Sequence, residues 1–385
     1  MRPPALVTKL ALAVLISFGA LSQLWLIGGT EARSALPAVV RNVWVPQAPE
    51  FLTVDQRTDR VFVISARNVL STLDARTGKV VHTARSGDRP GRAATDERTG
   101  RVFVPNIGHT VQVLDARNGV VLRTVTLPGN PGDVVVAERS GHVFVGNLGH
   151  DPIAMLDART GDIVRLITAG KDPGIVTIDH HTGRVFAATW DHHRVAVLET
   201  GTGNLLRMVN AGRKPIQIAA DERTDRIFET SAYAPPGPSF RPVYLLHMLD
   251  GRDGHVLAAV HLQDMPAGLA IAPRLGRVLL PEVTLRNEQG RIELFDAQSG
   301  SHLQTVTIPG GPVGGLAVDE AHGRLFVTSN VVGSSSLRVL DLRTLKVLET
   351  LHVGVDTAAM AIDQRTNRLF LANLRNSVTV VDLGS

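Results

Sequence analysis

Three histidines in the first half of the chain are the side chains best suited to metal chemistry. His109 ends the phrase Asn-Ile-Gly-His, His150 ends Asn-Leu-Gly-His, and His192 lies in Trp-Asp-His-His. Imidazole is the commonest metal ligand in proteins, and carboxylates stand beside two of these histidines. If the three segments converge, they could hold a divalent metal. If they do not, the histidines are solvent-exposed loop residues.

Basic and aromatic side chains form a second group of candidates, for binding a ligand. The cations could attract an acidic ligand or could be solvated turn charges. The aromatics include two in residues 233–242, where four prolines stiffen either a binding rim or a plain loop insertion. The candidates are Arg89, Lys171, Arg213, Lys214, Trp190, Tyr233 and Phe240.

Several other chemistries lack their residues. The chain has no cysteine, which excludes disulfides, thiolate metal sites and a cysteine nucleophile. It has no serine elbow, phosphate-binding loop or haem-attachment motif. A formal charge of +4 over 385 residues and an aromatic content of 4% argue against a nucleic-acid-binding surface. We therefore predict no cofactor, apart from the metal that the histidines could hold.

The first 35 residues differ in kind from the rest. Arg2 and Lys9 precede the apolar run 10–29, which could span a membrane or act as a long signal peptide. Ala32 and Ser34 offer a small-residue cleavage site, so retention and cleavage both stay open. In either case we expect residues 36–385 to be exported, to the periplasm or to the outer face of the cytoplasmic membrane. Membrane contact depends on the segment being retained.

A repeated phrase, recurring roughly every 40 residues, organises the exported part. It reads Asp-Glu-Arg-Thr-Gly-Arg-Val-Phe-Val-Pro-Asn over 96–106, followed by Val-Gln-Val-Leu-Asp over 111–115. Each copy contains four short runs of alternating apolar residues separated by turn residues, the pattern of a four-stranded propeller blade. Clear copies begin at Asp55, Asp96, Asp179, Asp221 and Asp363, and weaker ones near Val134, Leu269 and Leu316.

Eight copies predict an all-β propeller of eight four-stranded blades. The last copy supplies only three strands, and residues 38–45 near the other end of the chain resemble the missing outer strand. Pairing of the two ends would close the ring and remove two open sheet edges. Seven blades are the alternative if one divergent copy is a decoration. Residues 36–385 are then a single propeller domain.

The repeat resembles that of the YVTN-type β-propeller family, which is related to the lactonase-like propellers. Arg-Leu-Phe-Leu-Ala-Asn over 368–373 with Val-Thr-Val-Val-Asp over 378–382 is the nearest copy, and phenylalanine replaces the family's tyrosine in nearly every blade. The resemblance extends over about residues 38–384. It implies an exported scaffold and does not imply an activity.

Blade geometry sorts the candidates by face. With strands A to D running outward from the axis, the A–B and C–D turns lie on one face, and the B–C and D–A loops on the other. The recurrent Asp-x-Arg-Thr-Gly turns, with His180 and His181 among them, we interpret as turn chemistry. Loops that vary on a repeated scaffold usually carry binding. All the candidates above fall in B–C and D–A loops.

Two expectations follow for this second face. Equivalent points on adjacent blades should lie about 10 Å apart, so one metal ion would reach all three histidines only if the loops bend together. The innermost strands, such as 52–54 and 134–136, should carry no cluster of carboxylates or amides.

These observations favour a non-enzymatic scaffold of the cell envelope. It would be monomeric and would bind an unknown envelope protein or a small ligand through its B–C and D–A loops. A lactonase-like or metal-dependent hydrolase is the alternative, and binding of nucleic acid or another polyanion is the third reading.

Overall fold

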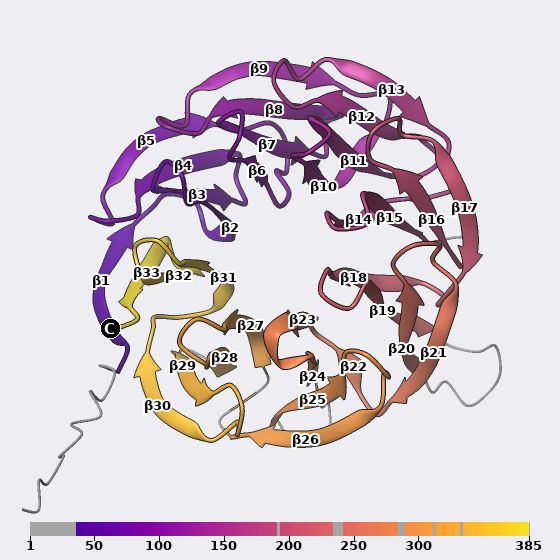
Figure 1. Ribbon diagram of the computed structural model, residues 1–385. Coiled ribbons are helices and arrows are strands. Elements are labelled where there is room, and N and C mark those ends of the chain that lie inside the picture. Colours follow the sequence, from indigo (N-terminus) through magenta and orange to yellow (C-terminus); the bar gives the residue numbers. More distant parts are fainter. Residues whose placement is uncertain are drawn as a thin grey trace, which may run out of the picture. The chain divides into compact units, whose positions relative to one another are not determined.

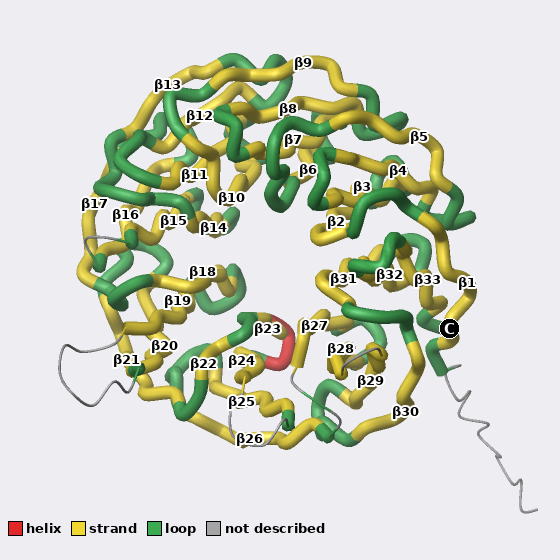
Figure 2. The backbone as a smooth tube through the Cα atoms, turned by 180° about the vertical axis from the view of Figure 1, so that it is seen from behind, coloured by secondary structure: helices red, strands yellow, loops and turns green. Residues whose placement is uncertain are grey.

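The alternating apolar runs fold into eight antiparallel sheets in the computed structural model (Figures 1 and 2). The structure describes residues 36–190, 193–233, 242–283, 289–309, 311, 313–331 and 334–384. The sheets surround a common axis with their first strands innermost, so the eight-bladed propeller is confirmed and seven blades are excluded. Within the described ranges the one helical segment is η1 (Pro273–Leu275).

The first four blades each take four consecutive strands, in the order A to D. Blade one contains β2 (Pro49–Asp55), β3 (Arg60–Ser65), β4 (Val69–Asp74) and β5 (Val80–Arg85). Blade two contains β6 (Ala94–Asp96), β7 (Arg101–Asn106), β8 (Thr110–Asp115) and β9 (Val121–Thr126). Blade three contains β10 (Asn130–Ala137), β11 (His142–Leu148), β12 (Ile153–Asp157) and β13 (Ile163–Ile167). Blade four contains β14 (Ile175–Asp179), β15 (Arg184–Thr189), β16 (Arg194–Glu199) and β17 (Leu205–Asn210).

The other blades follow the same plan, with a divided inner strand in blade six. Blade five contains β18 (Pro215–Asp221), β19 (Arg226–Tyr233), β20 (Val243–Asp250) and β21 (Val256–Leu262). Blade six contains β22 (Met265–Pro266), β23 (Ala270–Ala272), β24 (Arg277–Val283), β25 (Gly290–Asp296) and β26 (His302–Ile308). Blade seven contains β27 (Val313–Asp319), β28 (Arg324–Val331), β29 (Ser334–Asp341) and β30 (Val347–His352). Blade eight contains β31 (Thr357–Asp363), β32 (Arg368–Asn373), β33 (Ser377–Asp382) and β1 (Ala38–Trp44).

The eighth blade joins the two ends of the propeller. β1 pairs antiparallel with β33, in a register that runs from Ala38 opposite Asp382 to Trp44 opposite Ser377. In Figure 1 the indigo strand β1 therefore lies beside the yellow strand β33. The expected closure is confirmed, and the seam is an ordinary strand pairing within one blade.

The core lies between neighbouring sheets. Seven blades bury a strand-B phenylalanine completely, as expected: Phe62, Phe103, Phe144, Phe186, Phe228, Phe326 and Phe370. Phe103 of blade two, for example, packs in one cluster with Val134 and Val145 of blade three. Blade six has Leu279 at this position and buries Phe295 from its next strand. Because each blade packs on two neighbours, the ring distributes its apolar burial around the whole circumference.

Ala35–Ser385 forms one compact unit. Across the described ranges, every helical stretch is too short or too polar to cross a bilayer. The N-terminal segment that we expect to direct or anchor the chain lies outside the described residues, and its fate stays a prediction.

Candidate ligand-binding funnel

The A–B and C–D turns form the regular face of the ring. In blade one, Asp55 Oδ1 accepts hydrogen bonds from the backbone N–H and the hydroxyl of Thr58, both at 2.8 Å. Blades two, four and eight repeat the backbone bond. His181 Nδ1 lies 2.6 Å from Asp225 Oδ1, and this contact raises the pKa of His181 and lowers that of Asp225. The repeated bonds agree with the interpretation of these turns as structural.

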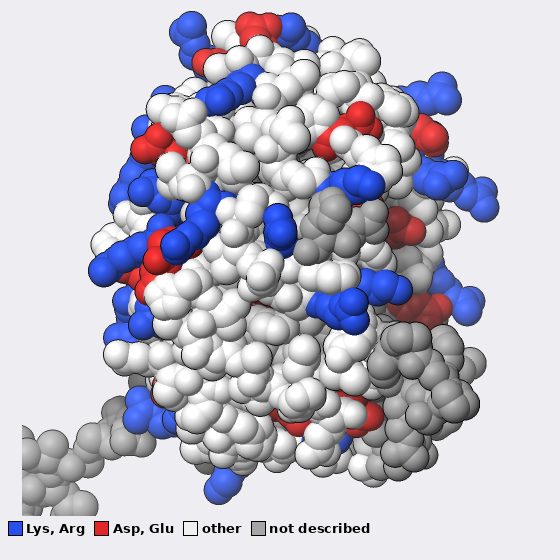
Figure 3. Space-filling view, turned by 90° about the vertical axis from the view of Figure 1, so that its right-hand side faces the viewer, with Lys and Arg blue, Asp and Glu red and all other residues white. Residues whose placement is uncertain are grey.

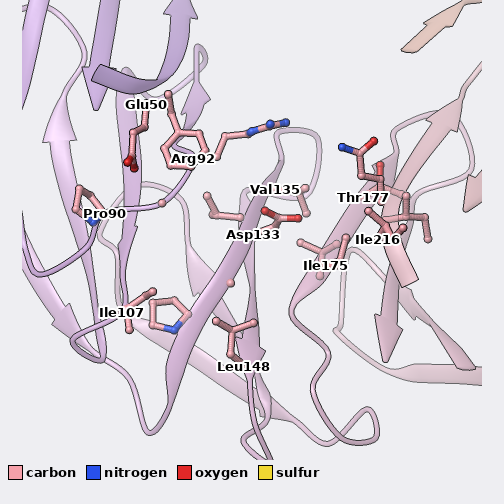
Figure 4. A pocket seen from close by; sticks show the side chains of 18 of the residues that line it. Glu50, Pro90, Arg92, Ile107, Asp133, Val135, Leu148, Ile175, Thr177 and Ile216 are labelled. Carbon is pink, nitrogen blue, oxygen red and sulfur yellow. The ribbon is translucent and has the colours of Figure 1, made fainter. Parts of the chain in front are cut away.

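The opposite face opens into a cavity of about 1000 Å³ at the inner ends of blades one to five, which we call the funnel. Arg92 and Asp133 extend into the same space, with Ile175, Thr177 and Ile216 on the facing wall (Figure 4). A cavity of this size is at the upper end of the range for small-molecule sites.

The side chains at one repeated position give the funnel its mixture of charged, polar and apolar groups. This position lies four places before the last residue of each innermost strand. Around the ring, from blade one to blade eight, it is occupied by Phe51, Arg92, Asp133, Ile175, Gln217, Gly268, Gly315 and Ala359. The first five line the funnel, and the last three are glycine or alanine. Since the same blade forms with either kind of residue, the larger side chains are not required by the fold.

Of the charged residues in the funnel wall, Asp133 is half-buried and Arg92 is exposed. Burial raises the pKa of Asp133, against the opposing effects of the Arg92 charge and of a hydrogen bond from the backbone N–H of Val176. Arg92 is exposed, and the described residues give its guanidinium no hydrogen bond or ion pair. The guanidinium of Arg92 is therefore available to a ligand. Glu50 and Arg89 also line the cavity.

Close backbone contact fixes the position of Asp133. Its N–H donates to the carbonyl oxygen of Gly174 in the next blade at 2.8 Å. A Cβ placed on Gly132 would lie 2.3 Å from that same oxygen. Only glycine at position 132 permits this approach, which joins blades three and four at the wall of the funnel.

A second, smaller cavity of about 250 Å³ adjoins the funnel, and we call it the crevice. Leu148 and Ile175 line both cavities, and Ala188, Trp190 and Pro215 complete much of the crevice wall. Trp190 is 47% exposed and Leu148 44% exposed. Two large apolar side chains thus meet solvent where the crevice opens.

The predicted cations and aromatics are distributed between the funnel and its surroundings. Arg89 lines the funnel and Trp190 the crevice. Lys171, Arg213 and Lys214 are exposed on the D–A loops and are not among the lining residues. The guanidinium carbon of Arg213 lies 5.3 Å from the centre of the Tyr233 ring, within cation–π range. Phe240 lies outside the described residues.

The predicted histidines are placed by turn geometry. His109 has a φ of 58° at the end of the B–C turn, a position that Asn68 and Asn376 fill with the same left-handed backbone. In blade four this position belongs to His193, with a φ of 54°, and not to its neighbour His192. His109 and His150 are exposed, and His192 lies outside the described residues.

Among the described residues, the group of side chains whose spacing could hold a metal ion lies away from these histidines. Asp250, Asp253 and His255 offer ligand atoms within 4.8 Å of one another on the C–D turn of blade five. His255 Nδ1 lies 2.6 Å from Asp253 Oδ1, and Arg207 lies 3.1 Å from the same carboxylate. Neither His109 nor His150 belongs to such a group, and a metal at the loop histidines stays a prediction.

The innermost strands carry single polar residues that the apolar runs did not indicate, although the described residues bring no three acidic or histidine ligand atoms together there. Strands β2, β10 and β18 begin several residues before the apolar runs that defined them in sequence, and they contribute Glu50, Asp133 and Gln217 to the funnel. Arg92, just before β6, completes the set that sequence reasoning missed. The missed signal was proline at the start of β2 and β18, because proline is tolerated at the first residue of a strand.

Blade six contains a buried charged cluster beyond the funnel. Arg291 lies 3.1 Å from Asp264, 3.2 Å from Glu293 and 3.8 Å from Glu282. Glu282 is fully buried, and burial together with the charge of Glu293 raises its pKa to about 7. This cluster holds the loop that carries Asp264 against β24 and β25.

Comparisons with known proteins support a propeller repeat. The family model described as outer membrane protein assembly factor BamB matches residues 50–220, which is less than half of the chain. No curated protein matches the sequence. The crystal structure of BamB from Moraxella catarrhalis is 14% identical with a TM-score of 0.66, and the match covers 90% of this chain and 100% of that one.

Two further solved structures have the same architecture. Sqt1 from Saccharomyces cerevisiae is 10% identical with a TM-score of 0.70, over 90% of this chain and 98% of that one. The computationally designed Ika8 protein is 14% identical with a TM-score of 0.68, over 89% and 98%. At these identities the likeness concerns the fold alone, and membership of the YVTN-type family stays a prediction. The chain is an eight-bladed β-propeller whose first four blades match a model of related propeller repeats.

Proposed function

We propose that this protein is a non-enzymatic binding module of the cell envelope that holds a partner protein on its B–C and D–A face, with the funnel at the centre of the contact. The observation that carries this proposal is the unequal ring of residues at the inner strands. Blades one to five place Phe51, Arg92, Asp133, Ile175 and Gln217 around one space, whereas blades six to eight place glycine or alanine there. A repeat that served only the fold would have no reason for this difference.

The two faces support the same assignment. The A–B and C–D turns repeat one hydrogen-bond pattern, whereas the opposite face carries the varied loops, the funnel and the exposed Trp190 and Leu148. The family match to an outer membrane protein assembly factor supports an envelope location and a protein partner. The apolar segment 10–29 supports export.

The alternatives have less support. Within the described residues, no three acidic or histidine ligand atoms gather in the funnel, as a metal-dependent hydrolase would need. Figure 3 shows Lys and Arg interspersed with Asp and Glu on the side that faces the viewer. A polyanion-binding surface would carry one sign of charge, so this side of the ring does not have the character of one.

Site-specific crosslinking in cells tests the proposal. A photoreactive amino acid at Leu148, at the edge of the funnel, should give a discrete adduct with another protein. The same amino acid at Arg117, which is exposed on the regular face, is the matched control and should give none. Equal adducts from both positions, or none from either, would contradict the proposal. Protease protection tests the location. An exported propeller should be cleaved once the envelope outside the cytoplasmic membrane is opened, while that membrane itself is still intact.

A further inference from the structure

The funnel and the crevice form one continuous surface with two chemical parts. Leu148 and Ile175 belong to the walls of both cavities, so a ligand can occupy both without leaving the protein. The funnel side presents the exposed guanidinium of Arg92, and the crevice side presents Trp190 and Leu148. A ligand that fits both parts carries an anionic group joined to a bulky apolar group.

The anion at Arg92 is best matched by a carboxylate. A guanidinium donates two parallel hydrogen bonds to a carboxylate and so fixes its orientation. Asp133 lies close enough for the Arg92 charge to act on its carboxyl group, which is half-buried and accepts a hydrogen bond from the Val176 N–H. Arg89 adds a second cation to the same wall. The exposed cations Arg89 and Arg92 are therefore more accessible to a ligand than the half-buried carboxylates of Glu50 and Asp133.

The crevice accepts a side chain rather than a whole ligand. Its volume of about 250 Å³ is below the usual range for a complete small-molecule site, whereas the funnel beside it is four times larger. A small amphipathic acid that reached both Arg92 and Trp190 would leave most of the funnel unfilled. A polypeptide backbone would fill that space and could bond to Gln217 and Thr177.

The inner strands also offer bonds to a backbone. β10, β14 and β18 each end their sheet on the axial side, so one edge of each strand has no neighbouring strand. Free strand edges bind extended peptides through main-chain hydrogen bonds. A chain end can enter a recess on the axis directly, whereas an internal segment must enter and leave as a loop.

We propose, on the basis of the proposed partner-binding role, that the funnel binds the C-terminal end of a protein, with the terminal carboxylate at Arg92 and a bulky apolar last side chain in the crevice beside Trp190. Trp190 then reports binding directly. Replacing Trp25 and Trp44 by phenylalanine in the full-length chain leaves Trp190 as its single tryptophan.

The test uses that full-length variant and measures Trp190 emission with acetyl-Ala-Ala-Phe and acetyl-Ala-Ala-Leu as free acids. We expect a saturable change, at least tenfold weaker binding of the C-terminal amides, and weaker binding of acetyl-Ala-Ala-Ser. Arg92→Gln should reduce the affinity for the free acids to that for the amides. Leu148→Asn should remove the preference for peptides that end in Phe or Leu over the peptide that ends in Ser. Arg117→Gln, on the regular face, is the matched control and should bind like the parent.

Three outcomes would overturn the inference: no saturable change, equal binding of acids and amides, or binding of 3-phenylpropionate as tight as that of the peptides. The last result would assign the site to small acids. Peptide binding could fail while the crosslink at Leu148 still forms. In that case the partner-binding role stands and only the recognition of a chain end is lost.

Discussion

The side chains of Asn42 and Thr379 lie 337 residues apart in sequence, and their Oδ1 and Oγ1 atoms meet at 2.6 Å across the seam of the ring. The same two residues are backbone partners in the pairing of β1 with β33. Thr379 is fully buried and also accepts a hydrogen bond from Asn373 Nδ2 at 2.8 Å. The ring is thus closed by a polar side-chain network as well as by a strand ladder.

Removing the hydroxyl at the seam should destabilise the propeller. We expect Thr379→Val to lower the free energy of unfolding by about 1–3 kcal/mol, because the buried amide of Asn373 and the backbone carbonyl of Val353 each lose a hydrogen bond to the Thr379 hydroxyl. Urea unfolding followed by circular dichroism measures the change. Thr124→Val, on the exposed face of β9, makes the same chemical change and should have little effect. Similar losses for both variants would contradict the role of the seam network.

Removing the closing strands should prevent stable folding. A chain without residues 358–385 loses β31, β32 and β33, which leaves β1 without its partner and opens two sheet edges. We expect an insoluble or non-cooperative product. Adding the missing segment as a separate peptide should restore a cooperative melting transition. A truncated chain that is soluble and melts cooperatively on its own would refute closure by this seam.

Sequence predicted the ring because its determinants recur in sequence. The Asp–Thr turn bonds and the strand-B phenylalanines repeat at fixed spacing, and each copy builds its blade locally. The seam was also predictable, since one end lacked the strand that the other supplied.

The funnel was not predictable in the same way, because its residues differ from blade to blade. Arg92 follows a Pro-Gly pair that indicates a loop, and Asp133 follows another. The two residues lie in different blades and are far apart in the sequence. Ring closure alone places these positions around one space, so only the three-dimensional structure identifies them as a set.

The contact between Gly132 and Gly174 should be essential to the funnel wall. In Gly132→Ala the new Cβ would lie 2.3 Å from the Gly174 oxygen, so the backbones of blades three and four must separate. We expect a loss of about 1–3 kcal/mol in stability, together with weaker peptide binding because Asp133 moves. Gly201→Ala is the matched control, because a Cβ there meets nothing within 4 Å. Unchanged melting and binding in Gly132→Ala would show that the two blades are not in contact as described.

The buried acid of blade six should make stability fall as pH rises. The pKa of Glu282 is about 7 in the folded protein, against an ordinary value of 4.5, so the folded state binds more protons between these two pH values. The stability from this group is therefore fully present below about pH 4.5 and is lost as pH rises through 7, amounting to about 3 kcal/mol. Glu293, whose pKa burial also raises, acts in the same direction.

Replacing Glu282 by glutamine tests this dependence, since the amide keeps the size of the side chain and cannot ionise. The free energy of unfolding, measured at pH 5 and pH 8, should fall less with pH in Glu282→Gln than in the parent protein. Arg291 keeps Asp264 and Glu293 as partners in the variant, so the cluster remains neutralised. Glu222→Gln removes an exposed carboxylate and should leave the parent's pH dependence unchanged. If Glu282→Gln retained the full fall in stability, the loss at high pH would have to come from other groups, and the ionisation of Glu282 would not govern the stability of blade six.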